Sequence, residues 1–356
     1  MADRTLLLFF ELIRIAVSSQ KELSKAPSDE EWKQLFVLAQ KQTLTGICFS
    51  AIEQLPAHQR PPKDVILSWY AFTNHIEKRN LVMDQRTQEA LDFFRGEGFK
   101  AVVLKGQGMA KLYPVPGRRV SGDIDVWLDG GRNRIYEFAR QFDKDGKLYG
   151  VNYHHVHLHL FEDVEVEVHI YPSYMKNPFL NHQLHTLCKR YPPANDAMTP
   201  SMAFNRVFIL LHCFDHLTGH GVGLRQVMDY YYVLQQGFTE VERQETLAWL
   251  KKLRLMTFAG AMMWVLKEVF GMEHQYFLVT PNAKEGQFLL EEICQTGNMG
   301  HHDERHWGSL KTPFSRFLYN LHRDTHFVLH YPQEVLWQPF FNIYVYTWRL
   351  FKGLNQ

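Results

Sequence analysis

The chain has 356 residues, of which 46% are hydrophobic and 22% are charged. This balance is ordinary for a folded globular protein and excludes a chain that is disordered throughout. Thirty-nine Lys and Arg residues against 38 Asp and Glu residues give a net charge of +1, which argues against a strongly basic nucleic-acid-binding protein. At about 150 residues per domain, the length predicts two or three domains.

The N-terminal region is predicted to be helical over residues 1–98. Apolar residues near the start follow helical spacing, and Ser28 or Asp29 is placed to cap a helix whose first turn is acidic. A proline-rich break at residues 56–62 precedes a long helical segment, residues 65–96. The sequence therefore predicts several helices of different lengths in this region.

The hydrophobic period then changes from helical to alternating. A β-branched run at residues 99–104 predicts a buried strand, and residues 120–128 predict a second one. Residues 151–161 and 164–170 also alternate, and only residues 162–163 separate them. This spacing predicts a hairpin with a tight turn.

Helical patterns fill most of the remaining sequence. Short helices are predicted at residues 108–113 and 132–144, and longer ones follow Pro172. The stretch 335–351 carries one charge. We interpret it as a terminal helix, broken at Pro339 and packed on the helical region, although such a segment could also lie on a membrane or a partner. The predicted fold class is α+β, with a small mixed sheet between helical regions.

The location of the protein is suggested by what the sequence lacks. The four cysteines are far apart and form no Cys-X-X-Cys pair, so neither a zinc ribbon nor a disulfide framework is indicated. The first apolar run is interrupted by Glu11 and Arg14, and no run reaches the roughly 18 apolar residues of a membrane helix. We expect a cytoplasmic protein with reduced thiols and no transmembrane segment.

Two carboxylates in the second predicted strand form the sharpest chemical feature. Asp123 and Asp125 are separated by one apolar residue, and the two-residue period of a strand puts them on the same face. Paired carboxylates repel each other and are stabilised by a divalent cation, and Mg²⁺ prefers oxygen ligands. On its own, however, an Asp-X-Asp sequence is also typical of a solvated strand face.

Basic residues close to this pair favour a phosphate-binding site. Lys105 and Gly106 follow a predicted buried strand and open a short helix, where backbone N–H groups and the lysine charge can hold phosphate oxygens. Arg119 lies four residues before Asp123. Its guanidinium could clamp a polyphosphate or neutralise the carboxylates.

The last predicted strand offers a third carboxylate. Alternation places Glu165, Glu167 and His169 on one face of the segment 164–170. If this strand pairs beside the Asp123–Asp125 strand, one glutamate completes a three-carboxylate site. Such a site around two Mg²⁺ ions is typical of in-line phosphoryl or nucleotidyl transfer.

The segment 102–128 resembles nucleotidyltransferase-fold proteins of the DNA polymerase β superfamily, and more narrowly a largely uncharacterised bacterial nucleotidyltransferase family. The matching motifs are Leu-Lys-Gly, Tyr-Pro, a single arginine, Gly-Asp-Ile-Asp and Glu-Val-His, at residues 104–106, 113–114, 119, 122–125 and 167–169. A weaker resemblance covers residues 212–234, where Arg225 and Asp229 fit the family pattern. The resemblance implies a nucleotidyltransferase core at residues 99–172, between an N-terminal helical region (1–98) and a C-terminal helical domain (173–356).

The family resemblance also implies a reaction. A nucleoside monophosphate would pass from an NTP to an unknown acceptor hydroxyl, with two Mg²⁺ ions held by Asp123, Asp125 and Glu167. Glu167 would act as a ligand or as the base for the attacking hydroxyl.

The resemblance further implies nucleotide contacts, with ATP as the default substrate. Lys105, Gly106 and Arg119 would hold the triphosphate. Arg225 and Asp229 are expected to contact the substrate or to support the residues that do, although an Arg–Asp pair at this helical spacing is equally a plain structural pair.

Two departures from the family pattern keep other functions open. The turn here is Lys-Gly rather than Gly-Ser or Gly-Gly, and the third acid is Glu167 rather than an aspartate. The alternative is a catalytically inactive nucleotidyltransferase fold that binds nucleotide or acts as a scaffold. A toxin-like enzyme that modifies tRNA ends is a further hypothesis, but the near-neutral charge gives no strong nucleic-acid signature.

Several histidines cluster in the sequence. His155, His157 and His159 share one face of a predicted strand, next to His154. They could bind zinc or phosphate, and we favour a polar strand face over a metal site. We interpret His212, His216 and His220 as residues that pack on a helix, and residues 301–306 as a polar surface loop.

Overall fold

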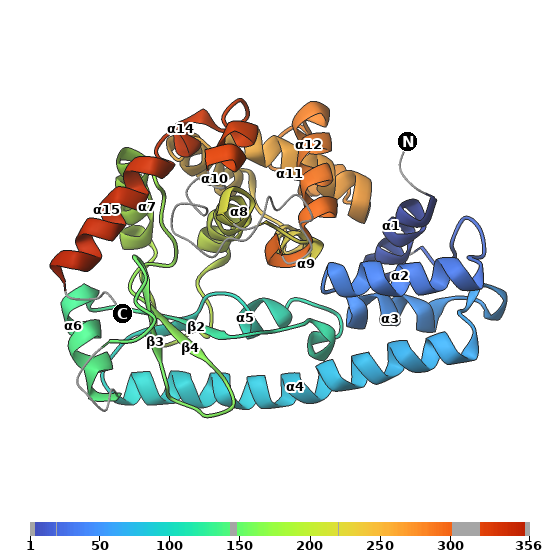
Figure 1. Cartoon of the computed structure of the whole chain (residues 1–356), viewed down its shortest axis with the longest axis horizontal. Helices are drawn as coiled ribbons and strands as arrows, with labels where there is room; N and C mark the ends of the chain where they lie inside the picture. Colours follow the sequence, from blue (N-terminus) through green and yellow to red (C-terminus); the bar gives the residue numbers. More distant parts are fainter. Residues whose placement is uncertain (1–3, 19, 143–147, 220, 301–320, 353–356) are drawn as a thin grey trace.

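The structure is a computed structural model that describes residues 4–18, 20–142, 148–219, 221–300 and 321–352. It has the predicted α+β fold, in which a small mixed sheet lies between helices (Figure 1). The N-terminal helices are α1 (Arg4–Val17), α2 (Asp29–Lys41), α3 (Thr45–Gln54) and α4 (Lys63–Gly96). The central elements are β1 (Ala101–Val103), α5 (Gln107–Ala110), the 3₁₀ turn η2 (Pro116–Arg118), β2 (Ile124–Leu128), α6 (Gly131–Ala139), β3 (His155–Leu158) and β4 (Val166–His169). The C-terminal helices are α7 (Pro178–Arg190), α8 (Met202–Gly219), α9 (Leu224–Gln235), α10 (Glu240–Lys252), α11 (Met256–Phe270), α12 (Ala283–Thr296), α14 (Pro332–Val335) and α15 (Gln338–Phe351).

Helix α2 starts where the sequence predicted, with Ser28 as its cap. The Ser28 hydroxyl accepts a hydrogen bond from the backbone N–H of Glu31, at 3.3 Å. The Glu31 carboxylate in turn accepts from the backbone N–H of Ser28, at 2.8 Å. Two backbone donors that the first helical turn leaves without partners are thereby satisfied.

The sheet is mixed, with the strand order β1-β2-β4-β3. Strands β1 and β2 are antiparallel, β2 and β4 are parallel, and β4 and β3 are antiparallel. The second strand is shorter than predicted, because it begins at Ile124 instead of residue 120. The carbonyl of Val120 accepts hydrogen bonds from the guanidinium groups of Arg119 and Arg225, so the chain before Ile124 is held by side chains.

The predicted hairpin of β3 and β4 forms, but the prediction of a tight turn between the two strands is wrong. A two-residue turn at residues 162–163 would place Leu158 opposite Glu167. In the structure, Leu158 pairs with Val166 and His157 pairs with Glu167. The ladder ends at Leu158, so residues 159–165 form a longer connection. The one-residue difference in pairing is what brings His157 beside Glu167.

The sheet separates two hydrophobic cores. One face packs against α4 and α6, where Val126 and Val168 meet Phe94 and Ile135. In Figure 1, α4 runs beneath the sheet along its whole width. The second half of helix α4 therefore packs on the sheet, whereas Val65 and Trp69 in its first half belong to the core of the N-terminal helices.

The opposite face of the sheet borders the second and larger core. This core joins α1–α3 with the C-terminal helices, and α1 contacts α11 directly. Trp127 of β2 contributes to it and stacks on Phe204 of α8, with ring centroids 5.3 Å apart. The side chains of the candidate site lie on this second face, between the sheet and the helices.

The C-terminal helix packs on loops near the hairpin. Helix α15 begins at Gln338, so Pro339 lies in its first turn and starts the helix instead of breaking it. Phe341 stacks on Tyr174, with ring centroids 5.1 Å apart, and Arg349 donates to the carbonyl of Val151 at 2.9 Å.

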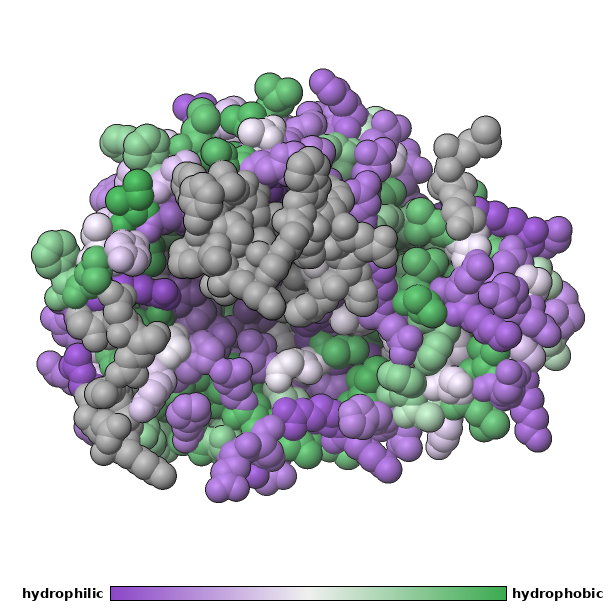
Figure 2. Space-filling view, viewed as in Figure 1, coloured by the Kyte–Doolittle hydropathy of each residue, from purple (hydrophilic) through white to green (hydrophobic). Residues whose placement is uncertain are grey.

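None of the helices in the described ranges is both long and apolar enough to cross a membrane. Hydrophilic and hydrophobic residues are interspersed over the face shown in Figure 2.

Gly46 in α3 is predicted to be required for the position of η2, just before the Asp123–Asp125 segment. A Cβ atom on Gly46 would lie 2.5 Å from the backbone oxygen of Arg118. We expect Gly46→Ala to destabilise the fold by about 1–3 kcal/mol, because a backbone atom must move. Gly96→Ala is the control, since a Cβ there meets nothing within 4 Å and should be neutral or stabilising by up to about 1 kcal/mol. Urea unfolding of both variants tests this, and equal effects would contradict it.

Candidate functional site

The parallel pairing of β2 with β4 brings two acidic residues together. Asp125 and Glu167 are direct partners in the register. Asp125 is 2% exposed, and the Glu167 side chain is 16% exposed. The condition set by the sequence is thus met, because the strand with the third acid lies beside the Asp-X-Asp strand.

Two basic side chains contact the buried carboxylate. Lys105, in the turn after β1, places its Nζ 2.9 Å from Oδ1 of Asp125. His169 of β4 places its Nε2 2.8 Å from the same oxygen and 3.4 Å from Oε2 of Glu167. Positive charge is therefore already directed at the carboxylates where a metal cation was predicted.

These contacts determine the charge of the site. Burial alone would raise the pKa of Asp125, but Lys105 and His169 outweigh it and hold that pKa well below the usual value of 3.8. Burial likewise lowers the pKa of Lys105, yet the surrounding carboxylates raise it above its usual value. At neutral pH the site contains an ionised Asp125 and a charged Lys105.

Asp123 lies one residue before β2 and is partly buried. The charge of Asp125 raises its pKa, burial adds to this, and Lys105 opposes both. Among the described residues, one group of three ligand atoms within 4.8 Å of one another consists of Asp125, Glu167 and His169. The groups of this kind do not include Asp123, so its role as a metal ligand stays a prediction.

The Lys105–Gly106 turn depends on glycine. Gly106 has φ of +48°, a conformation that other residues rarely adopt. A Cβ there would lie 3.5 Å from the backbone oxygen of Asp123, so the turn packs against the chain that carries the acids. The predicted contact of Lys105 and Gly106 with a nucleotide stays a prediction.

Arg119 and Asp229 form a buried ion pair. The Nε and Nη2 atoms of Arg119 each lie 2.7 Å from an oxygen of Asp229, and the Tyr113 hydroxyl donates to the same carboxylate at 2.7 Å. Arg119 is 2% exposed, and a guanidinium at this depth needs a charged partner. The sequence left open whether Arg119 neutralises the acids that follow it, and the structure pairs it with Asp229 of α9. Nucleotide contact by this pair stays a prediction.

Arg225 has no such carboxylate contact within the described part of the chain. It donates to the carbonyl of Val120 at 3.2 Å and to Oδ1 of Asn298 at 3.4 Å, while its Nε is buried without a hydrogen-bond partner. Burial lowers its pKa, and the charge of Arg119 lowers it further. Asp123 is among the charges that act on it. Arg225 thus acts electrostatically on the acids, and its Nε is left as a hydrogen-bond donor for an anion.

The structure adds two histidines, His155 and His157, that were not included in the site predicted from the sequence. His157 lies opposite Glu167 in the β3–β4 pair, and His155 lies opposite His169. A second group of three ligand atoms within 4.8 Å consists of His155, His157 and Glu167. The alternation of both segments was the signal, but it becomes specific only once the register is known. His159, which the pattern placed on the same face, is exposed beyond the end of β3.

The remaining histidine predictions concern other places. The rings of His212 and His216 lie together on α8, with centroids 4.4 Å apart, and burial holds the pKa of His212 well below its usual value. His220 and residues 301–306 lie outside the described residues.

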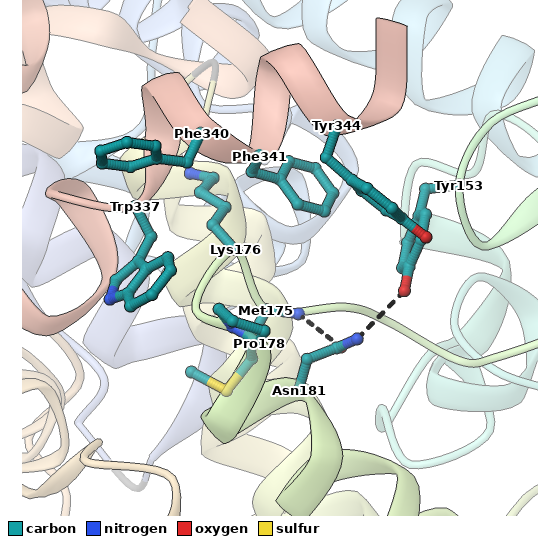
Figure 3. Close-up of a pocket in the computed structure, with 9 residues that line it drawn as sticks. All are labelled: Tyr153, Met175, Lys176, Pro178, Asn181, Trp337, Phe340, Phe341 and Tyr344. Carbon is teal, nitrogen blue, oxygen red and sulfur yellow. Dashed lines mark hydrogen bonds between the residues drawn. The ribbon is translucent and has the colours of Figure 1, made fainter. Parts of the chain in front are cut away.

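Among the described residues, two of the larger cavities open near the hairpin. One of about 310 Å³ is lined by side chains that include His155, His157 and Arg349. The other, of about 420 Å³, lies between α15 and the start of α7, and Figure 3 shows its aromatic and polar lining. The residues that line this second cavity are Tyr153, Met175, Lys176, Pro178, Asn181, Trp337, Phe340, Phe341 and Tyr344.

The sequence motifs predicted a small mixed sheet in which a strand with a third acid lies beside the Asp-X-Asp strand, and the structure makes this pairing parallel. The model of a family described as "Uncharacterised nucleotidyltransferase" matches residues 28–271, more than half of the chain, and the chain belongs to this family. A search of curated proteins found no match. A search of solved structures found none either.

We predict that Asp229→Asn destabilises the protein by about 3–5 kcal/mol, because it leaves the buried charge of Arg119 without its carboxylate. The matched control is Glu30→Gln, which removes an exposed carboxylate paired with Lys33 and should change stability by no more than about 0.5 kcal/mol. The measurement is the free energy of unfolding in urea. A loss below about 1 kcal/mol in Asp229→Asn would show that the pair is not a structural requirement.

Proposed function

We propose that this chain transfers a nucleoside monophosphate from an NTP to an acceptor hydroxyl, and that divalent cations, Mg²⁺ by default, assist at Asp123, Asp125 and Glu167. The observation that carries the proposal is the parallel register of β2 and β4, which puts Asp125 beside Glu167. Membership of a nucleotidyltransferase family supports the type of reaction.

The residues present fit hard divalent cations. Three carboxylates lie in one electrostatic neighbourhood, since Asp125 and Glu167 both act on the pKa of Asp123. A cation that binds carboxylate oxygens relieves the repulsion between these negative charges. Lys105 and His169 compensate Asp125 in the structure, which indicates how much positive charge this carboxylate attracts. Cations bound here would stabilise negative charge on the attacking and leaving oxygens.

The cationic side chains around the acids suit a triphosphate. Arg225 is partly buried and has an Nε without a partner among the described residues, and a phosphate oxygen would satisfy this donor. Lys105 carries its charge to Asp125 from the turn after β1. We therefore assign the triphosphate to Lys105 and Arg225, with Gly106 keeping the turn close to the acids.

The proposed reaction is a single displacement. The acceptor oxygen bonds to the α-phosphorus, the bond from the α-phosphorus to the bridging oxygen breaks, and pyrophosphate leaves. The hydroxyl proton passes to the Glu167 carboxylate. Burial raises the pKa of Glu167, but the contact with His169 outweighs it and keeps the pKa below the usual value, so this carboxylate is ionised at neutral pH and has no proton of its own to block that of the hydroxyl.

Two finer inferences accompany this function. The motifs at residues 104–106 and 122–125 support membership of the DNA polymerase β-like superfamily. The four free cysteines and the use of an NTP support a cytoplasmic location.

We predict that wild-type protein binds Mg·NTP and that Asp123→Asn weakens this binding at least tenfold, or by about 1.4 kcal/mol, and abolishes pyrophosphate release. The measurement is calorimetry with ATP, GTP, CTP and UTP, with and without Mg²⁺. The matched control is Asp92→Asn, which removes an exposed carboxylate of α4 and should leave binding unchanged.

The outcomes separate the active enzyme from the two alternative functions. Unchanged Mg·NTP affinity in Asp123→Asn would overturn the metal assignment. Tight binding by the wild type with no pyrophosphate release, whichever acceptor hydroxyl is supplied, would favour the inactive nucleotide-binding protein. Strong salt dependence of tRNA binding would point instead to an RNA acceptor.

A further inference from the structure

Glu167 faces two imidazoles of β3 with both of its oxygens. Nδ1 of His155 lies 3.4 Å from Oε2, and Nε2 of His157 lies 3.5 Å from Oε1. One ligand atom from each of the three residues can be chosen so that all lie within 4.8 Å of one another. The antiparallel pairing of His157 with Glu167 creates this group.

The separations between these atoms suit a bound metal better than hydrogen bonds. Hydrogen bonds from N–H to oxygen usually span about 2.7–3.2 Å, and both contacts of Glu167 are longer than that. Metal–ligand bonds of about 2.0–2.1 Å at tetrahedral angles put ligand atoms about 3.3–3.4 Å apart. Each histidine nitrogen lies close to this spacing from one carboxylate oxygen, at 3.4 Å from Oε2 and at 3.5 Å from Oε1, and one atom from each residue can be chosen with all three within 4.8 Å of one another.

The His157 ring is held in the orientation that a metal ligand needs. Its Nδ1 contacts the carboxylate of Glu165, which leaves Nε2 directed at Glu167. Histidine ligands commonly donate their other ring N–H to a carboxylate in this way, which fixes the ring and its tautomer. Gly150, with φ of +54°, packs its backbone against the same ring, because a Cβ there would lie 2.4 Å from Cγ of His157.

The group also has an open side. His155 and His157 line the cavity of about 310 Å³, together with polar residues that include Asn152 and Arg349. A metal with three protein ligands keeps a position free for water or another small ligand, and this cavity gives such a ligand room.

We propose that His155, His157 and Glu167 bind one transition-metal ion, Zn²⁺ or a similar borderline ion, with a fourth position open to the cavity. Two imidazoles and one carboxylate suit Zn²⁺, whereas Mg²⁺ prefers oxygen ligands alone. This site goes beyond the proposed nucleotidyl transfer, with which it shares Glu167. A metal ion bound here would hold Glu167 in place next to Asp125.

The test is a titration of the chelator-treated full-length protein with Co²⁺, a coloured substitute for Zn²⁺, followed by competition with Zn²⁺. We expect one Co²⁺ per chain to give the visible absorption bands of a tetrahedral site. His155→Ala and His157→Ala should each weaken binding at least as much as the loss of an outer-shell partner does, about 10–100-fold. The control His159→Ala removes an exposed histidine just beyond β3 and should bind like the wild type.

Asp123→Asn distinguishes this site from the nucleotide site. It should bind Co²⁺ like the wild type while it loses Mg·NTP. Absence of a Co²⁺ spectrum in the wild type would overturn the proposal without reference to any variant. Retention of wild-type affinity in His157→Ala, or loss of Co²⁺ in Asp123→Asn, would also overturn it. Zn²⁺ should raise the unfolding temperature of the wild type and of His159→Ala, and not that of His157→Ala.

Discussion

The candidate site depends on one backbone constraint, the parallel pairing of β2 with β4. These strands are distant in the sequence, and α6 and β3 lie between them. Their register places Asp125 beside Glu167, so two carboxylates that would repel each other share one face of the sheet. The apolar residues that alternate with them bury the opposite face against α4 and α6. Burial of that face fixes the register, because a shift of one residue would turn the acids into the core.

Concentrated negative charge explains most of the surrounding polar contacts. Lys105 and His169 compensate Asp125 directly. Arg119 is occupied by Asp229, in a pair that links the segment before β2 to α9. Arg225 alone among these cations has a buried nitrogen without a partner in the described residues. Arg225 therefore has a nitrogen left for a further anion. Lys105 contacts one carboxylate and lies near two more, whereas Arg119 is paired through two nitrogens with Asp229.

The histidines of β3 extend the same arrangement to the edge of the sheet. Because β3 pairs with β4 from the other side, Glu167 lies between the acids of β2 and the imidazoles of β3. Glu167 therefore has carboxylate oxygens of β2 on one side and imidazole nitrogens of β3 on the other. The cavity beside His155 and His157 leaves that edge accessible.

Local patterns along the chain are enough to predict the kinds of element and the chemistry that each carries. A β-branched run predicted β1, and alternation predicted the other strands and put Glu167 and His169 on one face. The capping residue Ser28 marked the start of α2. These signals act over a few residues. Tertiary structure decided the pairing of β2 with β4, the one-residue difference in the hairpin, and the choice of Asp229 as the partner of Arg119. These depend on contacts between distant segments, where burial and charge select one partner among many that local patterns allow.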